Sequence, residues 1–338
     1  MKIIVDAMGG DFAPKATVEG AILAAKEYQV EVILTGVEPE ILAAAKALGH
    51  DTLPSGITVH HTAEVITMED DPARVIREKK DSSMVVGLTM LRDGQADGFV
   101  SAGNTGALLS GATLITKRIR GVRRAALSPV IPNADGGAIL IDCGANVECT
   151  PEYLVQFAYM GSFYAKRLLK RANPKVGILS NGTEEGKGAK LQQDTYALLK
   201  EAPGLNFIGN IEGRDVLQGG VDVVVTDGFT GNVLLKGIEG TAMFLMGELK
   251  SVYTRNALTK CAALLVKNGL RGLKGKLDVS EIGGTALLGI AKPVIKAHGN
   301  SDAKTIRSAI RQARDIAASG IVEDITEQIG SLKQGEES

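Results

Sequence analysis

One pattern recurs along this chain: a short apolar run ends in a cluster of Gly, Asp, Asn or Thr, and a helical stretch follows. The runs are rich in Ile and Val and do not alternate with polar residues, which is typical of strands buried on both faces. Helices between such strands favour βαβ crossovers, so we expect an α/β fold with a largely parallel sheet flanked by helices. The predicted strands are Ile3–Met8, Val30–Thr35, Ile57–His61, Gly98–Ser101, Ala138–Asp142, Val176–Leu179, Phe207–Gly209 and Val223–Thr226.

Four helices can also be predicted from the sequence. Asp71-Pro72 predicts a helix start with Asp71 as the cap and proline at the first helical position, and Thr150-Pro151-Glu152 predicts another, in which Gly161 is tolerated. Two further stretches, Lys187–Lys200 and Ser301–Ala318, have the amphipathic spacing of helices.

The chain has 338 residues, 44% of them hydrophobic, which is enough for a sizeable core and for two lobes. We expect 1–333 to form a single α/β catalytic unit, with one or two lobes. The polar stretch 334–338 is expected to be a frayed tail.

The overall composition excludes several classes of protein. The net charge of −1 gives no sign of a basic face, so no nucleic-acid partner is expected. Cys143, Cys149 and Cys261 are too few for a disulfide framework and lack the spacing of a metal site. No signal peptide begins the chain, and no run of about 18 apolar residues predicts a membrane span. We expect a cytoplasmic protein without a metal.

The turns that follow the predicted strands form the candidate site, because ligands bind outside the carboxyl ends of strands in open α/β sheets. Six turns combine small residues, amides and hydroxyls, and we expect them to meet at one edge of one sheet. Exposed backbone N–H groups with Asn and Thr donors suit phosphate or an oxyanion, although each turn alone is also explained by capping and turn formation. The turns are Asp6–Asp11, Ser101–Ala107, Asp142–Asn146, Ser180–Gly188, Gly209–Asp215 and Thr226–Asn232.

Familiar catalytic motifs are missing. The chain has no GxxxxGK[ST] or GxSxG motif, and a GxGxxG motif begun at Gly186 is interrupted by Leu191. Cys143 follows an apolar run, where a cysteine is more often inert packing than a nucleophile. Lys187, between glycines, is free to meet an anion, and His298 precedes a predicted helix, where it could serve as an acid, base or donor. Alternatively, Lys187 is simply a solvated lysine at a helix start, and His298 is a capping or core histidine.

Six motifs in order resemble the signatures of bacterial phosphate acyltransferases, and together they span residue 2 to about 320: MKIIVDAMGGDFAPK, SAGNTGALL, DCGANV, GTEEGKG, VVVTDGFTGNVLLK and KPVIKAHGNSD. The resemblance implies transfer of a long-chain fatty acyl group from acyl-acyl carrier protein to inorganic phosphate. The acyl phosphate would serve phosphatidic acid synthesis.

The same resemblance implies a fold similar to phosphate acetyltransferase and to isocitrate and isopropylmalate dehydrogenases. It implies a homodimer without cofactors, associated peripherally with the membrane. The product would pass to a membrane-bound glycerol-3-phosphate acyltransferase.

Placement and resemblance together assign Lys187, His298 and Asn232 as catalytic residues. The family usually has histidine where this chain has Phe12, so no role is carried over to that position, and His298 is the better candidate. The predicted phosphate- and substrate-binding residues are Asp6, Gly9, Gly10, Gly103, Asn104, Thr105, Gly106, Asn146, Thr183, Glu184, Asn210, Asp227, Thr230 and Gly231.

The segment Glu248–Lys276 differs from the rest of the chain, because it carries seven Lys and Arg residues and one acidic residue. Its apolar residues recur near helical spacing, which predicts a protruding basic amphipathic helical segment. Such a segment suits a membrane surface, an acidic carrier protein or a dimer interface. The predicted contact residues are Val252, Leu258, Leu264, Leu265, Lys260, Lys267 and Arg271.

Three alternatives stay open at this point. A short-chain acyl-CoA:phosphate acyltransferase would share the fold and the anion site. A decarboxylating dehydrogenase would need a metal-binding aspartate set that the sequence does not show clearly. A non-enzymatic binding protein for phosphorylated or acylated metabolites would differ only in lacking turnover.

Overall fold

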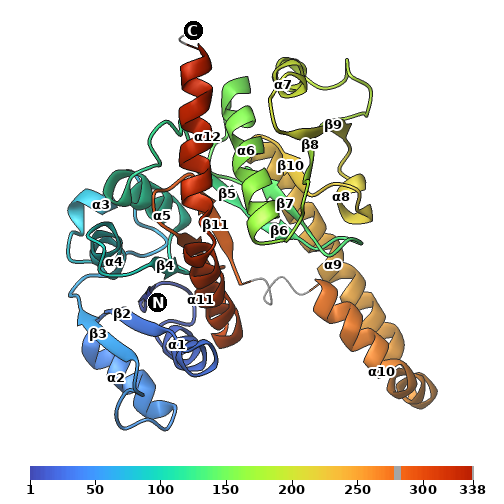
Figure 1. The fold of residues 1–338 in the computed structure, drawn as a ribbon. Helices are drawn as coiled ribbons and strands as arrows, with labels where there is room; N and C mark the ends of the chain where they lie inside the picture. The colour runs from blue at the N-terminus through green and yellow to red at the C-terminus, as the bar shows by residue number, and fades with distance from the viewer. Residues whose placement is uncertain (278–282, 337–338) are drawn as a thin grey trace.

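The computed structural model describes residues 1–277 and 283–336, without the side chains of 268, 271, 273–277 and 331–336, and confirms the predicted α/β class (Figure 1). All eight predicted runs form strands, and four short strands were not predicted. The strands are β1 (Lys2–Asp6), β2 (Glu31–Gly36), β3 (Ile57–His61), β4 (Gly98–Ser101), β5 (Ala126–Ser128), β6 (Val130–Ile131), β7 (Ala138–Ile141), β8 (Lys175–Leu179), β9 (Asn206–Ile211), β10 (Val223–Val225), β11 (Thr285–Leu288) and β12 (Val294–Lys296).

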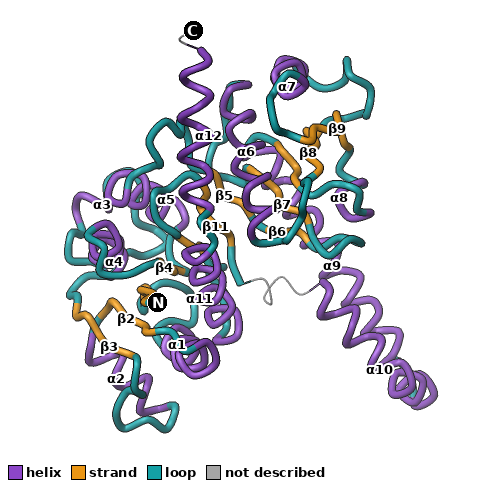
Figure 2. The backbone as a smooth tube through the Cα atoms, viewed as in Figure 1, coloured by secondary structure: helices purple, strands orange, loops and turns teal. Residues whose placement is uncertain are grey.

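Helices lie between most of the strands, as Figure 2 shows. The α-helices are α1 (Lys15–Tyr28), α2 (Glu38–Ala47), α3 (Val75–Glu78), α4 (Ser83–Arg92), α5 (Thr105–Gly111), α6 (Pro151–Arg167), α7 (Lys190–Lys200), α8 (Asp215–Gln218), α9 (Gly228–Thr254), α10 (Ala257–Leu277), α11 (Ala303–Ala318) and α12 (Ile321–Glu336), with a π-helix, η1 (Ala112–Thr116), continuing α5.

The strands form two sheets, so the expectation of one sheet is wrong. The seven-stranded sheet has the order β3-β2-β1-β4-β12-β11-β5, and the five-stranded sheet has the order β6-β7-β10-β8-β9. Most neighbouring strands are parallel, whereas β11 runs antiparallel to its two neighbours and β6 antiparallel to β7. The six candidate turns are therefore divided between two sheet edges.

The seven-stranded sheet is covered on both faces, which explains its uniformly apolar strands. Ile3 and Val5 of β1 belong to the core cluster that includes α1 and α11 residues, while Ile4 packs with the α4 side of the sheet. Alternate residues of one strand point to opposite faces, so β1 contributes to both cores. Helices α1 and α11 pack directly against each other over one face.

The five-stranded sheet is also enclosed on both faces. Helix α6 crosses β7 and β10 closely, and a Cβ atom at Gly161 would lie 2.5 Å from Val223. A side chain at this position would displace Val223, so glycine allows the close crossing. On the other face, Leu140 and Val224 pack with residues of α8 and the start of α9.

The chain passes between the sheets at Pro129, where β5 in one sheet is followed at once by β6 in the other. The backbone N–H of Leu140 donates to the Pro129 carbonyl at 2.9 Å, which ties the crossing to β7. After the second sheet is complete, β11 and β12 return to the first sheet. One hydrophobic cluster contains residues of both sheets, including Ile3 and Val225.

The basic segment 248–276 was predicted as one helical segment, but it spans the end of α9 and nearly all of α10. The break lies at Arg255-Asn256, because Asn256 and Thr259 form a reciprocal cap. Asn256 Oδ1 accepts from the Thr259 N–H at 2.9 Å, and Thr259 Oγ1 accepts from the Asn256 N–H at 3.1 Å. The two helices lie side by side and project from the body of the molecule (Figure 1).

The predicted helix starts are correct to different degrees. Thr150-Pro151 begins α6 as predicted, and α11 begins at Ala303, where the Asp302 carboxylate accepts from the Thr305 N–H. Asp71 caps a turn that leads only into the short α3. Helix α7 begins at Lys190 rather than at 187, because Gly188 before it has a φ of +95°.

Helix α12 includes residues 334–336, which the sequence predicts to be part of a frayed tail; residues 337–338 lie outside the described residues. Ile321, Ile325 and Ile329 of α12 recur every fourth residue and are buried in the core, so they hold the first turns of this helix against the body of the protein.

Candidate functional site

Three neighbouring strands of the seven-stranded sheet end in polar side chains. Val5 of β1 lies opposite Val100 of β4, and Ser101 of β4 lies opposite Lys296 of β12. Asp6, Ser101 and Lys296 therefore form a row at the carboxyl edge of this sheet. We call this the first edge.

Asp6 is buried and held by two serines. The hydroxyls of Ser83 and Ser101 donate to its two carboxylate oxygens at 2.6 and 2.7 Å. Burial raises the pKa of Asp6, and the hydrogen bonds from Ser83, Ser101 and the backbone oppose that rise. A Cβ atom at Gly9 would lie 2.7 Å from both Asp6 Oδ2 and the Gly103 nitrogen, so the two predicted glycine turns pack directly on this carboxylate.

Lys296 completes the first edge and was not predicted as a site residue. It is only 9% exposed, and its ammonium donates to the carbonyl oxygens of Ala102, at 3.4 Å, and of Ala297. Burial lowers the pKa of Lys296 to about 8, against the attraction of Asp6 and Asp11. A lysine closing the apolar run Val294–Lys296 was the signal that could have identified it.

His298 follows Lys296 by two residues, so the predicted histidine also lies at the first edge, where its side chain is exposed. The Asp11 N–H donates to the Gly299 carbonyl at 2.8 Å, which joins the turn after β1 to the turn after β12. A Cβ atom at Gly10, whose φ is +109°, would lie 3.1 Å from the same carbonyl. The structure thus brings Gly10 and His298 to one place.

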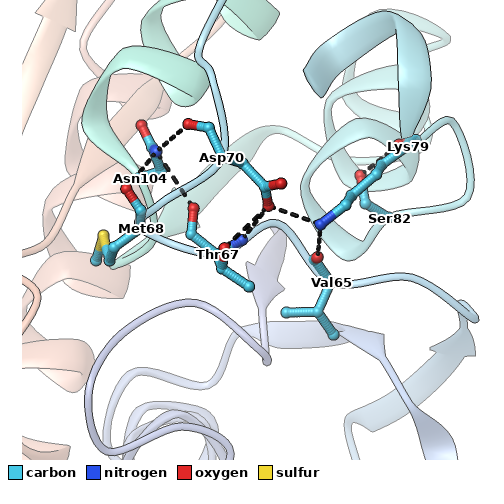
Figure 3. Close-up of polar contacts among 7 residues, drawn as sticks. All are labelled: Val65, Thr67, Met68, Asp70, Lys79, Ser82 and Asn104. Carbon is cyan, nitrogen blue, oxygen red and sulfur yellow. Dashed lines mark hydrogen bonds and ion pairs between the residues drawn. The ribbon is translucent and has the colours of Figure 1, made fainter. Parts of the chain in front are cut away.

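Asn104 has a clamping role that its position in a turn did not reveal (Figure 3). Its Oδ1 caps α5 by accepting from the Ala107 N–H at 3.0 Å. Its amide nitrogen donates to the carbonyls of Thr67, Met68 and Asp70 at 3.2 to 3.3 Å. The predicted phosphate ligand therefore has its side chain engaged within the protein, beside exposed Thr105 and half-buried Gly106.

The loop that Asn104 holds is closed by an ion pair on its other side. Lys79 donates to Asp70 at 2.6 Å and to the Val65 carbonyl at 2.9 Å, as Figure 3 shows. This loop lies next to the first edge, because the Met68 Cε atom would be 3.5 Å from a Cβ atom at Gly299.

The carboxyl edge of the five-stranded sheet, the second edge, has Asp142 at its centre. This buried carboxylate accepts five hydrogen bonds, from the backbone of Leu127, Cys143, Ala145 and Asn146 and from the Asn146 amide. Burial raises the pKa of Asp142, and these hydrogen bonds oppose the rise. The Asn146 amide also donates to the Ala125 carbonyl at 2.8 Å, so this predicted substrate ligand shapes its own turn.

The predicted residues of the turn after β10 pack on Asp142. Asp227 caps α9 by accepting from the Thr230 N–H at 2.8 Å and from the Thr230 hydroxyl at 2.7 Å. Gly231 lies against the Asp142 carbonyl so closely that a Cβ atom would stand 2.0 Å from it. Asn232 is exposed, and its amide lies 3.9 Å from the place of a Cβ atom at Gly144.

Lys187 lies in the turn after β8, on the second edge. Its side chain is exposed, as are those of Thr183 and Glu184, and its stem passes over Gly182. The Asn210 amide donates to the Glu184 carbonyl at 2.7 Å and so fixes this turn to β9. The four predicted residues of this region are thus close in space, and Lys187 is exposed among them.

The two edges are connected through β5. The Leu127 N–H donates to Asp142 at 2.8 Å, and the Leu127 carbonyl accepts from the Cys143 N–H at 2.9 Å. Since β5 pairs with β11 in the seven-stranded sheet, a shift of either sheet would move the Asp142 turn.

Covalent and metal chemistry find little support in the described residues. Burial raises the pKa of the Cys143 thiol to about 12 and that of Cys149 also to about 12, so neither readily gives a thiolate. Within the described ranges, no group of three or more His, Cys, Asp or Glu side chains is placed to hold a metal ion.

The predicted contact residues of the basic segment lie on the α9–α10 hairpin. Val252 and Leu258 are exposed, Leu264 and Leu265 are 70% and 89% exposed, and Lys260 and Lys267 accompany them. The Arg271 side chain lies outside the described residues. Among the described helices, none combines the length and apolar character needed to cross a membrane.

Comparison with known proteins shows what this chain is similar to. A sequence model of the family described as "Fatty acid synthesis protein" matches residues 1–324. A protein of Alkaliphilus oremlandii named phosphate acyltransferase is 48% identical over 336 residues, which cover 99% of each chain. A protein of the same name from Oceanobacillus iheyensis is 48% identical over 338 residues and covers 100% of each.

Solved structures share the fold at much lower identity. A phosphotransacetylase from Streptococcus pyogenes has a TM-score of 0.62 at 20% identity, over 94% of each chain. A branched-chain phosphotransacylase from Enterococcus faecalis has a TM-score of 0.59 at 15% identity, over 94% of this chain and 100% of the other. A 4-hydroxythreonine-4-phosphate dehydrogenase from Klebsiella pneumoniae has a TM-score of 0.51 at 13% identity, over 94% and 99%.

Proposed function

Because this chain belongs to the phosphate acyltransferase family, we propose that it transfers a long-chain fatty acyl group from acyl-acyl carrier protein to inorganic phosphate. One observation carries the proposal: relatives with that name align with 99 or 100% of the chain at 48% identity. The family description, fatty acid synthesis, favours a fatty acyl group. The acyl phosphate would then serve phosphatidic acid synthesis.

The reaction needs no covalent enzyme intermediate. A phosphate oxygen attacks the thioester carbonyl carbon, and the resulting tetrahedral oxyanion collapses as the carbon–sulfur bond breaks. The carrier thiolate leaves and takes up a proton, and the acyl phosphate remains. The protein must bring two reactants together and place donors near the oxyanion, which is positioning and electrostatic stabilisation.

We assign the phosphate to Lys187 and to the backbone of Gly103–Gly106, with Asn232 as a donor to phosphate or to the carbonyl oxygen. Thr230 would hold the turn beside them, because its N–H and its hydroxyl both donate to Asp227. His298 would act as an acid or hydrogen-bond donor to the leaving group. Asp6, Asn104, Asn146 and Asp227 would support these groups, since each accepts or donates hydrogen bonds that fix a turn. Both sheets would then serve one catalytic unit.

Replacing Lys187 tests this assignment. Lys187→Ala is expected to raise the phosphate KM about 10-fold or more, the effect of losing one hydrogen bond to a charged group. Lys190→Ala is the matched control, because Lys190 is also exposed and pairs with Asp194 instead. Unchanged phosphate KM and turnover in Lys187→Ala would remove Lys187 from the site.

The α9–α10 hairpin is proposed to hold the enzyme at the cytoplasmic membrane surface, near a membrane-bound glycerol-3-phosphate acyltransferase that takes the product. Exposed leucines beside lysines suit a surface of anionic lipid. The same face would suit an acidic carrier protein or the second subunit of a homodimer.

A liposome assay separates these occupants. Leu264→Glu with Leu265→Glu is expected to abolish sedimentation with anionic liposomes. Leu198→Glu with Leu217→Glu adds the same charge elsewhere and should leave sedimentation intact. If the hairpin variant still binds liposomes, the membrane assignment fails; a raised KM for carrier protein or a loss of dimer would identify the other occupants.

The reaction itself is tested by trapping acyl phosphate as its hydroxamate. Product from palmitoyl-carrier protein that requires both phosphate and enzyme is the expected result. Product from acetyl-CoA and phosphate, but not from palmitoyl-carrier protein, would favour the short-chain alternative, toward which the phosphotransacetylase-like fold points. No product from any acyl donor would contradict the proposed activity.

A further inference from the structure

Lys296 is a buried cation that none of the roles assigned above uses. It lies at the end of β12, between the turn after β4 and the turn that carries His298. Only 9% of the residue is exposed, so its ammonium has lost most of its contact with water. Burying a charge in this way is unfavourable unless the charge is paired and hydrogen-bonded.

The partners of Lys296 satisfy it only in part. An ammonium has three N–H donors, and two of them reach the carbonyl oxygens of Ala102 and Ala297. In the part of the chain that the structure describes, the third donor has no acceptor. Asp6 attracts the ammonium, but its two carboxylate oxygens accept the hydroxyls of Ser83 and Ser101.

A purely structural lysine would be a poor choice here. Hydrogen bonds to two neutral carbonyls contribute less stability than the desolvation of the ammonium costs. An apolar side chain of the same length would fill the space without that penalty. An unfilled donor on a cation, next to the Gly103 turn, instead suits an anion.

We propose that Lys296 binds the phosphate substrate through its third N–H, between the turn after β4 and the turn after β12. This inference rests on the proposed acyl transfer, since phosphate is its substrate. It adds a second cation to the site, on the first edge, where Lys187 belongs to the second edge. Asp6 attracts the charge of Lys296, and the hydrogen bonds of the described ammonium go to Ala102 and Ala297 rather than to Asp6.

Lys296→Met tests the inference, because methionine keeps the length and volume of the side chain and removes its charge. Phosphate affinity, measured by calorimetry without an acyl donor, should fall about 10- to 100-fold, the range for a hydrogen bond to a charged group. The KM for acyl donor should stay within about twofold, and the midpoint of thermal unfolding should be unchanged or higher, as expected when an unfavourable buried charge is removed. Lys292→Met, an exposed lysine just before the same strand, is the matched control and should bind phosphate normally.

Unchanged phosphate affinity in Lys296→Met would overturn the inference. A lower unfolding midpoint, with equal losses for phosphate and acyl donor, would also overturn it and identify a structural tie. If Lys296→Met does not fold, Lys296→Arg keeps the charge but moves the N–H donors. Its phosphate affinity should be measurable but lower than that of wild type. An affinity equal to that of wild type would contradict the proposal. Calorimetry measures binding without turnover, so it tests this inference separately from the proposed reaction. If Lys296→Met weakens phosphate binding but the wild type makes no acyl phosphate, only the proposed reaction is refuted.

Discussion

The two sheets each place a buried aspartate after a strand, and the two carboxylates are held in different ways. Asp142, after β7, accepts five hydrogen bonds from N–H donors, four of them in the backbone. Asp6, after β1, is held mainly by two serine hydroxyls and lies near the cation Lys296. Burial raises the pKa of both, so burial alone does not distinguish them.

The kind of donor distinguishes the two edges. A backbone N–H can only donate, in a fixed direction, so the Asp142 turn is rigid and specific for an ionised carboxylate. A hydroxyl rotates and can donate or accept. The first edge can therefore adapt when a substrate anion changes the local charge, whereas the Asp142 turn is a framework from which exposed residues such as Asn232 project.

The largest effect is expected when Asp142 is changed to Asn. One amide NH₂ group would then face N–H donors, and at least two buried donors would lose their acceptor. We expect the free energy of unfolding to fall by about 3 kcal/mol, measured by urea denaturation. Asp6→Asn should cost only about 1 kcal/mol, because Ser83 and Ser101 can reorient.

Equal losses in Asp142→Asn and Asp6→Asn would break this comparison. Since the two positions are similarly buried, each variant is the control for the other. A larger loss in Asp6→Asn would show that its attraction to Lys296 contributes more than the hydroxyl bonds.

A smaller effect is expected at Asn104. It belongs to the first edge, but its side chain bonds to backbone groups, as Asp142 does at the second edge. Asn104→Ala removes a helix cap and three hydrogen bonds to the loop that ends at Asp70. The expected loss is about 2 kcal/mol, from the cap and from unpaired carbonyls. Faster hydrogen exchange should be confined to this loop and the first turn of α5; exchange spread over the whole sheet would contradict a local clamp.

The sequence predicted the local elements well, because they depend on neighbouring residues. Every predicted apolar run became a strand, and Pro151 began a helix where expected. The Asn256–Thr259 cap that separates α9 from α10 could also have been predicted from the sequence. Apolar residues at helical spacing on both sides of it favoured one continuous helical segment instead.

What depends on distant residues could not be predicted. Apolar parallel runs do not specify which strands pair, so the division into two sheets was invisible, and β12 has only three residues. Lys296 was overlooked because β12 pairs with β4, which is far away in the chain. Asn104 was predicted as a ligand, but three carbonyls from another segment occupy its amide.

The pH dependence of stability sharpens the contrast between Lys296 and other lysines. The pKa of Lys296 is lowered to about 8 from 10.5 by burial, so between these values the unfolded chain binds more protons than the folded one. The cost of burying the charge is fully present below pH 8 and is relieved as the pH rises toward 10.5. At about 1.4 kcal/mol per pKa unit, the stability of wild type should therefore rise by about 3 kcal/mol relative to that of Lys296→Met between neutral pH and about pH 10.5.

Urea denaturation of both proteins across this pH range measures the difference directly. Asp6 and Asp11 are the charged groups that act on Lys296, and both are present in wild type and in Lys296→Met. A stability difference that does not change with pH would mean that Lys296 keeps its ordinary pKa.

The smallest effect on stability is expected at Lys187, the exposed counterpart of Lys296. Without phosphate, Lys187→Ala should unfold within about 0.5 kcal/mol of wild type, as surface substitutions do. With phosphate at 100 times the wild-type Kd, wild type should gain about 2.7 kcal/mol, and a tenfold weaker Kd would reduce that gain by about 1.3 kcal/mol. A loss of stability without phosphate would make Lys187 a structural part of its turn. An undiminished gain with phosphate would leave the second edge without its cation, and Lys296 on the first edge would then be the cation that receives the phosphate.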